Sequence, residues 1–212
     1  MSETENYRGF TININNDEIG MNPRTDCDNG GKMICFHGRY NLGDKHEFSN
    51  PDELQEFVDS DKVLAKLDLF LYDHSGITMS TGAFSCRFDS GQVGVIYMTK
   101  EGCDLIGYDE GWRKSQFPDK TMEEALTEVL EMEVKEYDKF ISEGCYMYDI
   151  EETGDSCGGF LGYNHEESGL MEYAKNSIDC EINSRIKARI ERLKELIKSK
   201  VPIIYRTLPA IS

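Results

Sequence analysis

The order of strand-like and helical patterns constrains the fold of this chain more than any other feature. Short apolar runs typical of strands precede and follow one long helical pattern, instead of alternating with helices one by one. This order disfavours a doubly wound parallel sheet. We predict an α+β fold with a mixed, mostly antiparallel sheet, helices on one face of that sheet, and a C-terminal amphipathic basic helix. The expected strands are residues 10–14, 33–37, 67–72, 77–81, 92–99, 145–150 and 156–163, of which the last is an edge strand.

Two helices carry clear start signals. Pro51 follows Asn50 and suits the first position of a helix that ends near residue 58. The Thr121 hydroxyl and the Glu124 carboxylate form a capping box for a helix that continues to about residue 142, and Gly144 ends it. The other expected segments are a frayed polar terminus over 1–7, a loop over 100–120, a short helix near 167–177 and a final helix over 181–200.

Charge is distributed unevenly along the chain. The net charge of −17 combines 37 Asp and Glu against 15 Lys and Arg in residues 1–179 with three against eight in residues 180–212. We therefore predict an acidic α+β domain over 1–179, and a basic amphipathic helix with its tail over 180–212. A domain with a net charge of −22 repels nucleic acid and is attracted to basic protein surfaces, including the nucleic-acid channels of other proteins. Simple solubility is the plainer interpretation.

No segment indicates secretion or a membrane anchor. The apolar runs fall short of the roughly 18 to 20 residues that span a bilayer, and the first residues lack the basic and apolar regions of a signal peptide. The seven cysteines show no C-x-x-C spacing, so we expect free thiols, no structural zinc and no other cofactor. We predict a cytoplasmic protein without a membrane partner.

A group of charged residues follows the second expected strand. His37 and His46 lie nine residues apart across a loop that also contains Arg39 and Asp44. Such a composition at a strand end is common in functional sites. The favoured interpretation is structural: His37 caps the strand, and Arg39 forms an ion pair with Asp44.

A second group lies around a turn. Asp73 and His74 are adjacent and point to opposite faces of a strand, so Asp73 does not orient His74 as in a catalytic triad. The favoured interpretation is a turn in which the Asp73 side chain bonds to the backbone before Gly76.

A catalytic alternative depends on strand pairing. If the strand that ends at Asp73 neighbours the strand that follows Asp89, then Asp73, His74 and Asp89 share one sheet edge. Carboxylate and imidazole groups bind divalent cations that polarise phosphoryl oxygens. Together with His37, these residues are the candidate catalytic set of a metal-dependent hydrolase or nuclease acting on nucleic acid or nucleotides.

The helix after Thr121 carries repeated carboxylates. Glu124, Glu128 and Glu131 form a negative stripe whose spacing is comparable to that of phosphates in nucleic acid. This stripe is the candidate surface for a basic partner, although a solvated helix face is the more common explanation.

The final helix has an apolar stripe with basic neighbours. Steps of four, four, three and four residues connect Ile182, Ile186, Ile190, Leu193 and Ile197, which approaches a coiled-coil seam. Three interpretations stay open: packing on the chain's own acidic domain, which the opposite charges favour; a homodimer; and binding to RNA or another partner. The candidate partner-binding residues of this helix are Arg185, Arg189 and Arg192.

Several short phrases at strand ends and turns are distinctive. They are Asn22-Pro23-Arg24, Asp28-Asn29, Met33 to His37, Arg39 to Asp44, Tyr72 to Gly76, Ser85-Cys86 and Asp89 to Gly94. In these phrases the chain resembles a group of uncharacterised proteins from bacteriophages and other mobile elements, over about residues 20–165. The resemblance implies no specific activity. It implies a context, because small acidic proteins of mobile elements resemble anti-restriction and anti-CRISPR inhibitors in charge and size.

These observations favour an anti-CRISPR-like counter-defence protein that inhibits a host nucleic-acid-targeting nuclease complex. On this hypothesis the acidic domain binds a basic surface of that complex, and the basic helix contacts guide RNA or a second surface. The metal-dependent hydrolase is the first alternative. The second is an oligomeric accessory protein that assembles through residues 181–200.

Overall fold

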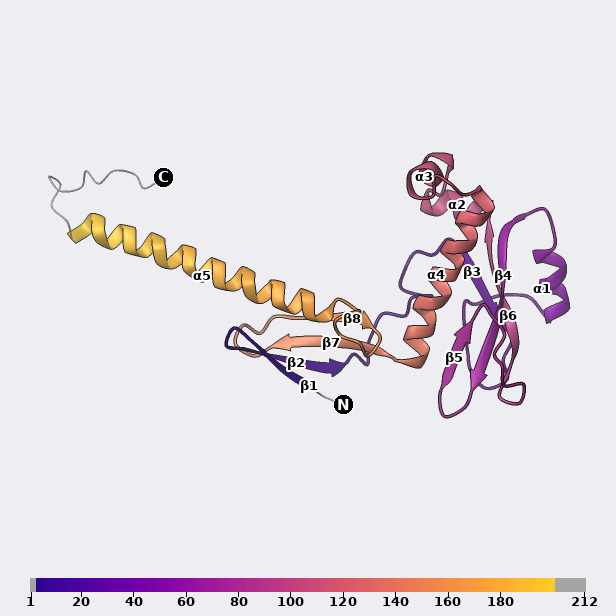
Figure 1. Cartoon of the computed structure of the whole chain (residues 1–212), viewed down its shortest axis with the longest axis horizontal. Helices are drawn as coiled ribbons and strands as arrows, with labels where there is room; N and C mark the ends of the chain where they lie inside the picture. The colour runs from indigo at the N-terminus through magenta and orange to yellow at the C-terminus, as the bar shows by residue number, and fades with distance from the viewer. Residues whose placement is uncertain (1–2, 201–212) are drawn as a thin grey trace. The chain divides into compact units, whose positions relative to one another are not determined.

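The computed structural model of the protein describes residues 3–200 and, within them, two four-stranded antiparallel sheets and five helices (Figure 1). The predicted α+β class is confirmed, with two sheets in place of the single predicted one. The predicted tail beyond residue 200 lies outside the described residues. The strands are β1 (Glu3–Tyr7), β2 (Phe10–Asn16), β3 (Gly31–Cys35), β4 (Val63–Asp73), β5 (Ile77–Ser80), β6 (Ser90–Thr99), β7 (Cys145–Ile150) and β8 (Ser156–Leu161). The helices are α1 (Pro51–Val58), α2 (Lys100–Ile106), α3 (Glu110–Gln116), α4 (Met122–Ser142) and α5 (Leu170–Lys200).

Packing divides the described chain into two compact units. Unit 1 contains residues 3–15, 147–157 and 165–200, and unit 2 contains residues 16–146 and 158–164. The two units are defined by contacts between residues, whereas the boundary predicted between residues 179 and 180 was placed where the charge along the chain changes sign. Helix α5 continues across that position because it contains neither Gly nor Pro, so the two separate helices predicted there are wrong.

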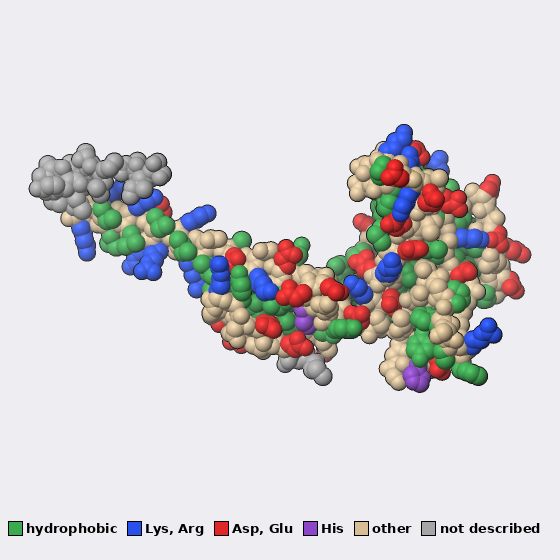
Figure 2. All heavy atoms as spheres, viewed as in Figure 1, with side chains coloured by type: hydrophobic (Ala, Val, Ile, Leu, Met, Phe, Trp, Pro, Cys, Tyr) green, Lys and Arg blue, Asp and Glu red, His purple; other side chains and the backbone are tan. Residues whose placement is uncertain are grey.

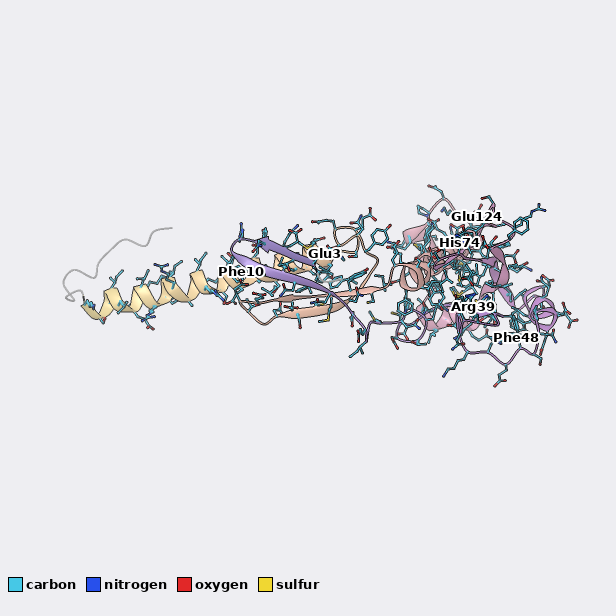
Figure 3. All side chains as sticks on the ribbon, turned by 90° about the horizontal axis from the view of Figure 1, so that it is seen from below. Glu3, Phe10, Arg39, Phe48, His74 and Glu124 are labelled. Carbon is cyan, nitrogen blue, oxygen red and sulfur yellow. The ribbon has the colours of Figure 1, made fainter. Side chains whose placement is uncertain are left out.

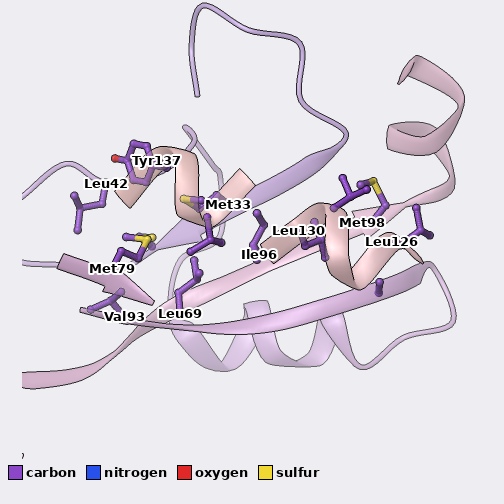
Figure 4. Close-up of a cluster of buried hydrophobic side chains, with 14 of the residues drawn as sticks. Met33, Leu42, Leu69, Met79, Val93, Ile96, Met98, Leu126, Leu130 and Tyr137 are labelled. Carbon is purple, nitrogen blue, oxygen red and sulfur yellow. The ribbon is translucent and has the colours of Figure 1, made fainter. Parts of the chain in front are cut away.

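The sheet of unit 2 has the strand order β3-β6-β4-β5, with antiparallel pairing throughout. Met33, Ile96 and Met98 lie on one face and pack with residues of α4 in the core that Figure 4 shows. Val95 and Tyr97 lie on the other face and pack with residues of α1. Helices therefore cover both faces of this sheet rather than the one face predicted, because the successive residues 95–98 of β6 are all apolar and point alternately to the two faces.

Helix α4 begins and ends as predicted. The Glu124 amide donates to the Thr121 hydroxyl at 3.2 Å, and the Thr121 amide donates to the Glu124 carboxylate at 2.7 Å. At the other end Gly144 adopts a φ of 88°, which ends the helix. Between these caps, Leu126 and Leu130 are fully buried against the sheet (Figure 4).

The segment between β6 and α4 forms helices α2 and α3, not the predicted loop. Thr99 caps α2 by accepting from the Gly102 amide, and Asp109 caps α3 by accepting from the Trp112 amide. A Cβ atom at Gly102 would lie 2.2 Å from the carbonyl oxygen of Gly30. This glycine therefore serves close packing rather than a turn.

The other sheet has the order β1-β2-β7-β8, so β8 is an edge strand as predicted. Strand β1 replaces the predicted frayed terminus. Its residues are almost all exposed, so they show no apolar alternation, and the strand is held by backbone pairing with β2 that sets Glu3 opposite Ile14. Arg8 and Gly9, at φ values of 51° and 84°, form the two-residue turn between the strands.

The first turns of α5 lie along this sheet (Figure 1). Leu170, Ala174 and Ile178 are fully buried, as are Ile12 of β2 and Ile150 of β7. These side chains form the core of unit 1 and fix the direction in which α5 leaves it.

Candidate functional site

The ends of β4 and β6 bring the predicted catalytic residues together. In the β4–β6 pairing Tyr72 lies opposite Ser90, and the Asp73 amide donates to the Asp89 carbonyl oxygen at 2.8 Å. Asp73, His74 and Asp89 therefore meet at one end of the sheet, as the neighbouring-strand hypothesis predicted. We call them, with His37, Arg39, Tyr40 and Cys86, the sheet-end cluster.

Asp73 belongs to one side of this cluster. Its carboxylate accepts from Arg39 Nη1 at 3.1 Å and from the Tyr40 hydroxyl at 3.3 Å. His37 supports both residues, because its Nδ1 accepts from their two amides and its ring stacks on Tyr40 at 5.1 Å. The predicted ion pair between Arg39 and Asp44 is wrong, and so is the predicted bond from Asp73 to its own turn. The turn is closed instead by the His74 amide, which donates to the Gly76 carbonyl oxygen.

His74 and Asp89 form the other side. His74 Nδ1 lies 3.5 Å from Asp89 Oδ2, and the Cys86 thiol donates to the same oxygen at 3.5 Å. Figure 3 labels His74 and Arg39, whose side chains are 64% and 69% exposed. Ion pairs this exposed contribute about 0–1 kcal/mol, because water screens them.

The chemistry available to the sheet-end cluster is limited by its own contacts. Arg39 and Tyr40 each bond to one oxygen of Asp73, whereas His74 lies beside Asp89. Among residues 3–200, no group of three or more His, Cys, Asp or Glu is arranged to hold a metal ion.

A second polar cluster, which we call the Arg24 network, is buried in unit 2. Arg24 donates to Asp44 at 2.7 Å and 3.1 Å, to Glu133 at 2.6 Å and to the Gly31 carbonyl oxygen at 2.7 Å. The Asp44 and Glu133 carboxylates accept in turn from the amides of Met33 and Gly31. Burial opposes the positive charge, but the bonds and charges of Asp44 and Glu133 outweigh it and raise the pKa of the Arg24 guanidinium.

The Arg24 network was not predicted as a site. It joins the Asn22–Arg24 segment, β3 and α4 into one connected structure, and the side chain of Arg24 is only 1% exposed. The distinctive phrases contain Arg24 and Asp44, which was the available signal. Nothing in the sequence indicated Glu133, which lies 109 residues from Arg24.

Two of the three glutamates predicted to form an acidic stripe on α4 bond to other residues of the protein. Glu124 closes the capping box, and its bond from the Thr121 amide lowers the pKa of its carboxyl group. Glu128 forms an ion pair with Lys120. These residues and Glu131 line a shallow groove of about 520 Å³, together with Met132. Glu131 is thus the member of the predicted set that is best placed to meet a partner.

The outer part of α5 carries a row of exposed apolar residues. From Asn183 to Lys200, a segment that we call the α5 tip, every residue is exposed. Its large aliphatic residues are 42–51% exposed to solvent. They are Ile186, Ile190, Leu193, Leu196 and Ile197. Figure 2 shows these apolar side chains between basic ones.

The predicted partner-binding arginines lie on this part of α5. Arg185 bonds to Glu181 at 2.6 Å and lies over the Phe10 ring, whereas Arg189 and Arg192 lie farther out on the exposed tip. Within unit 1, residues 183–200 are not packed on the sheet, because all of them are exposed. Packing of this helix on the acidic surface of unit 2 stays a prediction.

No disulfide joins the cysteines among residues 3–200. Cys35 is buried, and burial raises the pKa of its thiol to about 12. Cys27, Cys157 and Cys180 are exposed.

Comparisons with known proteins add no relative: no protein-family model, no curated protein and no solved structure matches the chain. No helix among residues 3–200 is long and apolar enough to cross a membrane.

Proposed function

We propose that this protein is a non-catalytic counter-defence protein of the anti-CRISPR type, which binds a basic surface of a host nuclease complex through unit 2. The observation that carries the proposal is the separation of charge. Unit 2 contains 27 Asp and Glu against 13 Lys and Arg, whereas the α5 tip contains two Glu against seven Lys and Arg. A net −14 on a compact unit attracts basic surfaces over a distance of about a Debye length.

The internal contacts of unit 2 favour binding over catalysis. The carboxylates of the Arg24 network are held by Arg24 and backbone amides, whereas those of the sheet-end cluster are held by the side chains around them. In contrast, Glu123, Glu131 and Glu136 project from the outer side of α4, a helix fixed at both ends by its caps. Carboxylates on a rigid helix lose little conformational entropy when they meet Lys and Arg side chains. The resemblance to mobile-element proteins supports the counter-defence context.

The test is inhibition of purified, guide-loaded nuclease complexes by the full-length protein at increasing salt. Glu131→Lys with Glu136→Lys reverses two charges on α4 and is expected to weaken binding by about tenfold or more. The matched control is Glu195→Lys, which makes the same type of change on the α5 tip and leaves binding to the basic surface within about twofold. Binding that does not depend on salt, or equal losses in the two variants, contradicts the electrostatic mechanism.

A further inference from the structure

The apolar line along α5 changes direction between the base of the helix and its tip. Leu170, Ala174 and Ile178 face the core of unit 1. From Ala174 the apolar positions continue in four steps of four residues to Ile190. Each step exceeds one helical turn by about 40°, so the line rotates by about 160° between these two residues. The stripe on the tip therefore points away from the sheet that buries the base.

The tip stripe has the spacing of a coiled-coil seam. Ile190 and Ile197 occupy a positions, and Ile186 and Leu193 occupy d positions, separated by steps of four, three and four. The residues of the stripe are about half exposed, because the sheet that covers the base of the helix does not cover them. An apolar seam of this kind is completed by another helix that inserts its own side chains between these residues.

The flanks of the seam determine which helix fits. Lys187 and Lys194 occupy the e positions, and Arg189 and Leu196 occupy the g positions, so one side of the seam is basic and the other carries one cation. In a parallel pair of identical tips Arg189 would face Lys194 of the other copy, and in an antiparallel pair Lys187 would face Lys194. Both arrangements place like charges together, which disfavours a homodimer through the tip.

Neither nucleic acid nor a membrane explains the apolar seam and its basic flanks as well as an acidic helix does. Phosphates are bound by the cations alone and leave the aliphatic stripe in water. Helices that lie in a membrane interface use Trp and Phe beside Leu, and residues 183–200 contain no aromatic side chain. An acidic helix satisfies both the seam and its basic flanks.

We propose that the α5 tip is a heterotypic coiled-coil surface whose partner is an acidic amphipathic helix of another protein, with aliphatic residues at a and d and Glu or Asp at e and g. The carboxylates of that helix pair with Lys187, Arg189 and Lys194 while its aliphatic residues cover Ile190 and Leu193. This proposal uses a different surface from the one proposed for unit 2 and does not depend on it.

The test uses the full-length protein and a labelled synthetic four-heptad peptide with Ile at a, Leu at d and Glu at e and g. Its control is the same peptide with Lys at e and g. Fluorescence anisotropy is expected to show binding of the acidic peptide and about tenfold or more weaker binding of the basic one. Ile190→Glu is expected to weaken binding of the acidic peptide by about tenfold or more. Ala188→Glu introduces the same group at the exposed f position, away from the seam, and is expected to change binding by less than about twofold.

Several outcomes overturn the proposal. One is an equal loss of binding in Ile190→Glu and Ala188→Glu. Another is a homodimer, seen by analytical ultracentrifugation, that Ile190→Glu dissociates. A third is displacement of the labelled acidic peptide by an RNA oligonucleotide or by phosphatidylserine vesicles at a lower concentration than the unlabelled acidic peptide requires. None of these results bears on nuclease inhibition through unit 2, because the charge reversals on α4 test that function separately.

Discussion

The Arg24 network and the sheet-end cluster are built from the same kinds of residues, but they differ in burial. Both contain an arginine that bonds to a carboxylate, and both contain residues of the distinctive phrases. The Arg24 side chain is 1% exposed, whereas that of Arg39 is 69% exposed. In a buried site the loss of one partner leaves an uncompensated charge in a low dielectric, whereas water replaces a lost partner at the surface. The same Arg–carboxylate contact therefore organises unit 2 in one place and only orders a turn in the other.

The largest expected effect is the loss of Arg24. Arg24→Met removes the cation but leaves Asp44 and Glu133 enclosed, so we expect unit 2 to lose about 3–5 kcal/mol of stability. Trp112 is the single tryptophan of the chain and packs on the core of unit 2, so its fluorescence in a urea titration reports on this unit.

The matched control is Arg39→Met in the sheet-end cluster, which we expect to cost about 0–1 kcal/mol. Equal midpoint shifts in the two variants contradict the comparison. If Arg24→Met is too unstable to purify, combining it with Asp44→Asn and Glu133→Gln neutralises the enclosed charges and is expected to restore a folded protein.

The contrast also separates what the sequence predicts from what it does not. The approach of Asp73 and Asp89 in the sheet-end cluster was predictable, because β4 and β6 have strong apolar patterns and their pairing brings the two residues together. The Arg24 network was not, because Glu133 is one carboxylate among many on α4 and only the tertiary packing selects it. The predicted pairing of Arg39 with Asp44 failed for the same reason: Arg24 reaches Asp44 from an earlier loop.

Secondary structure follows the same division. Caps and apolar periodicity located α1, α4 and most strands correctly. Strand β1 has no apolar face that a sequence pattern could reveal, because it lies at the edge of its sheet and is held by backbone pairing with β2 and by polar side-chain contacts. Helix α2 follows β6 without a break, and its Gly102 is set by contact with Gly30, which no local rule reveals.

A smaller effect is expected from neutralising the sheet-end cluster itself. Asp73→Asn with Asp89→Asn removes the partners of Arg39 and His74, yet all four side chains are near the surface. We expect a stability change of about 1 kcal/mol or less and no change in binding to a basic partner. Urea unfolding and the salt-dependent inhibition assay measure these two quantities. If the double variant instead abolishes a hydrolytic activity of the purified protein on nucleic acid or nucleotides, then the cluster is catalytic and the comparison fails.

The smallest expected effect concerns Asp138 on α4. The exposure of this residue is intermediate between that of the Arg24 network and that of the sheet-end cluster. Its carboxylate accepts from the Met79 amide at 2.7 Å, and burial raises the pKa of its carboxyl group. The folded state therefore holds the proton more strongly than the unfolded state. The stability that this stronger proton binding contributes to the folded state is present at low pH and is lost as pH rises through the folded-state pKa.

Asn at this position does not titrate, and its side-chain oxygen still accepts from Met79. We expect Asp138→Asn to be more stable than the natural protein at pH 7, by about 0.5 kcal/mol or less, with the difference shrinking as pH falls toward the ordinary carboxyl range. Urea midpoints from pH 4 to pH 7 measure this difference. Glu136→Gln, on the exposed side of the same helix, removes the same charge and measures the contribution of net repulsion. If the two variants respond equally to pH, burial of Asp138 has no influence on stability, and the energetic distinction between buried and exposed carboxylates is limited to the Arg24 network.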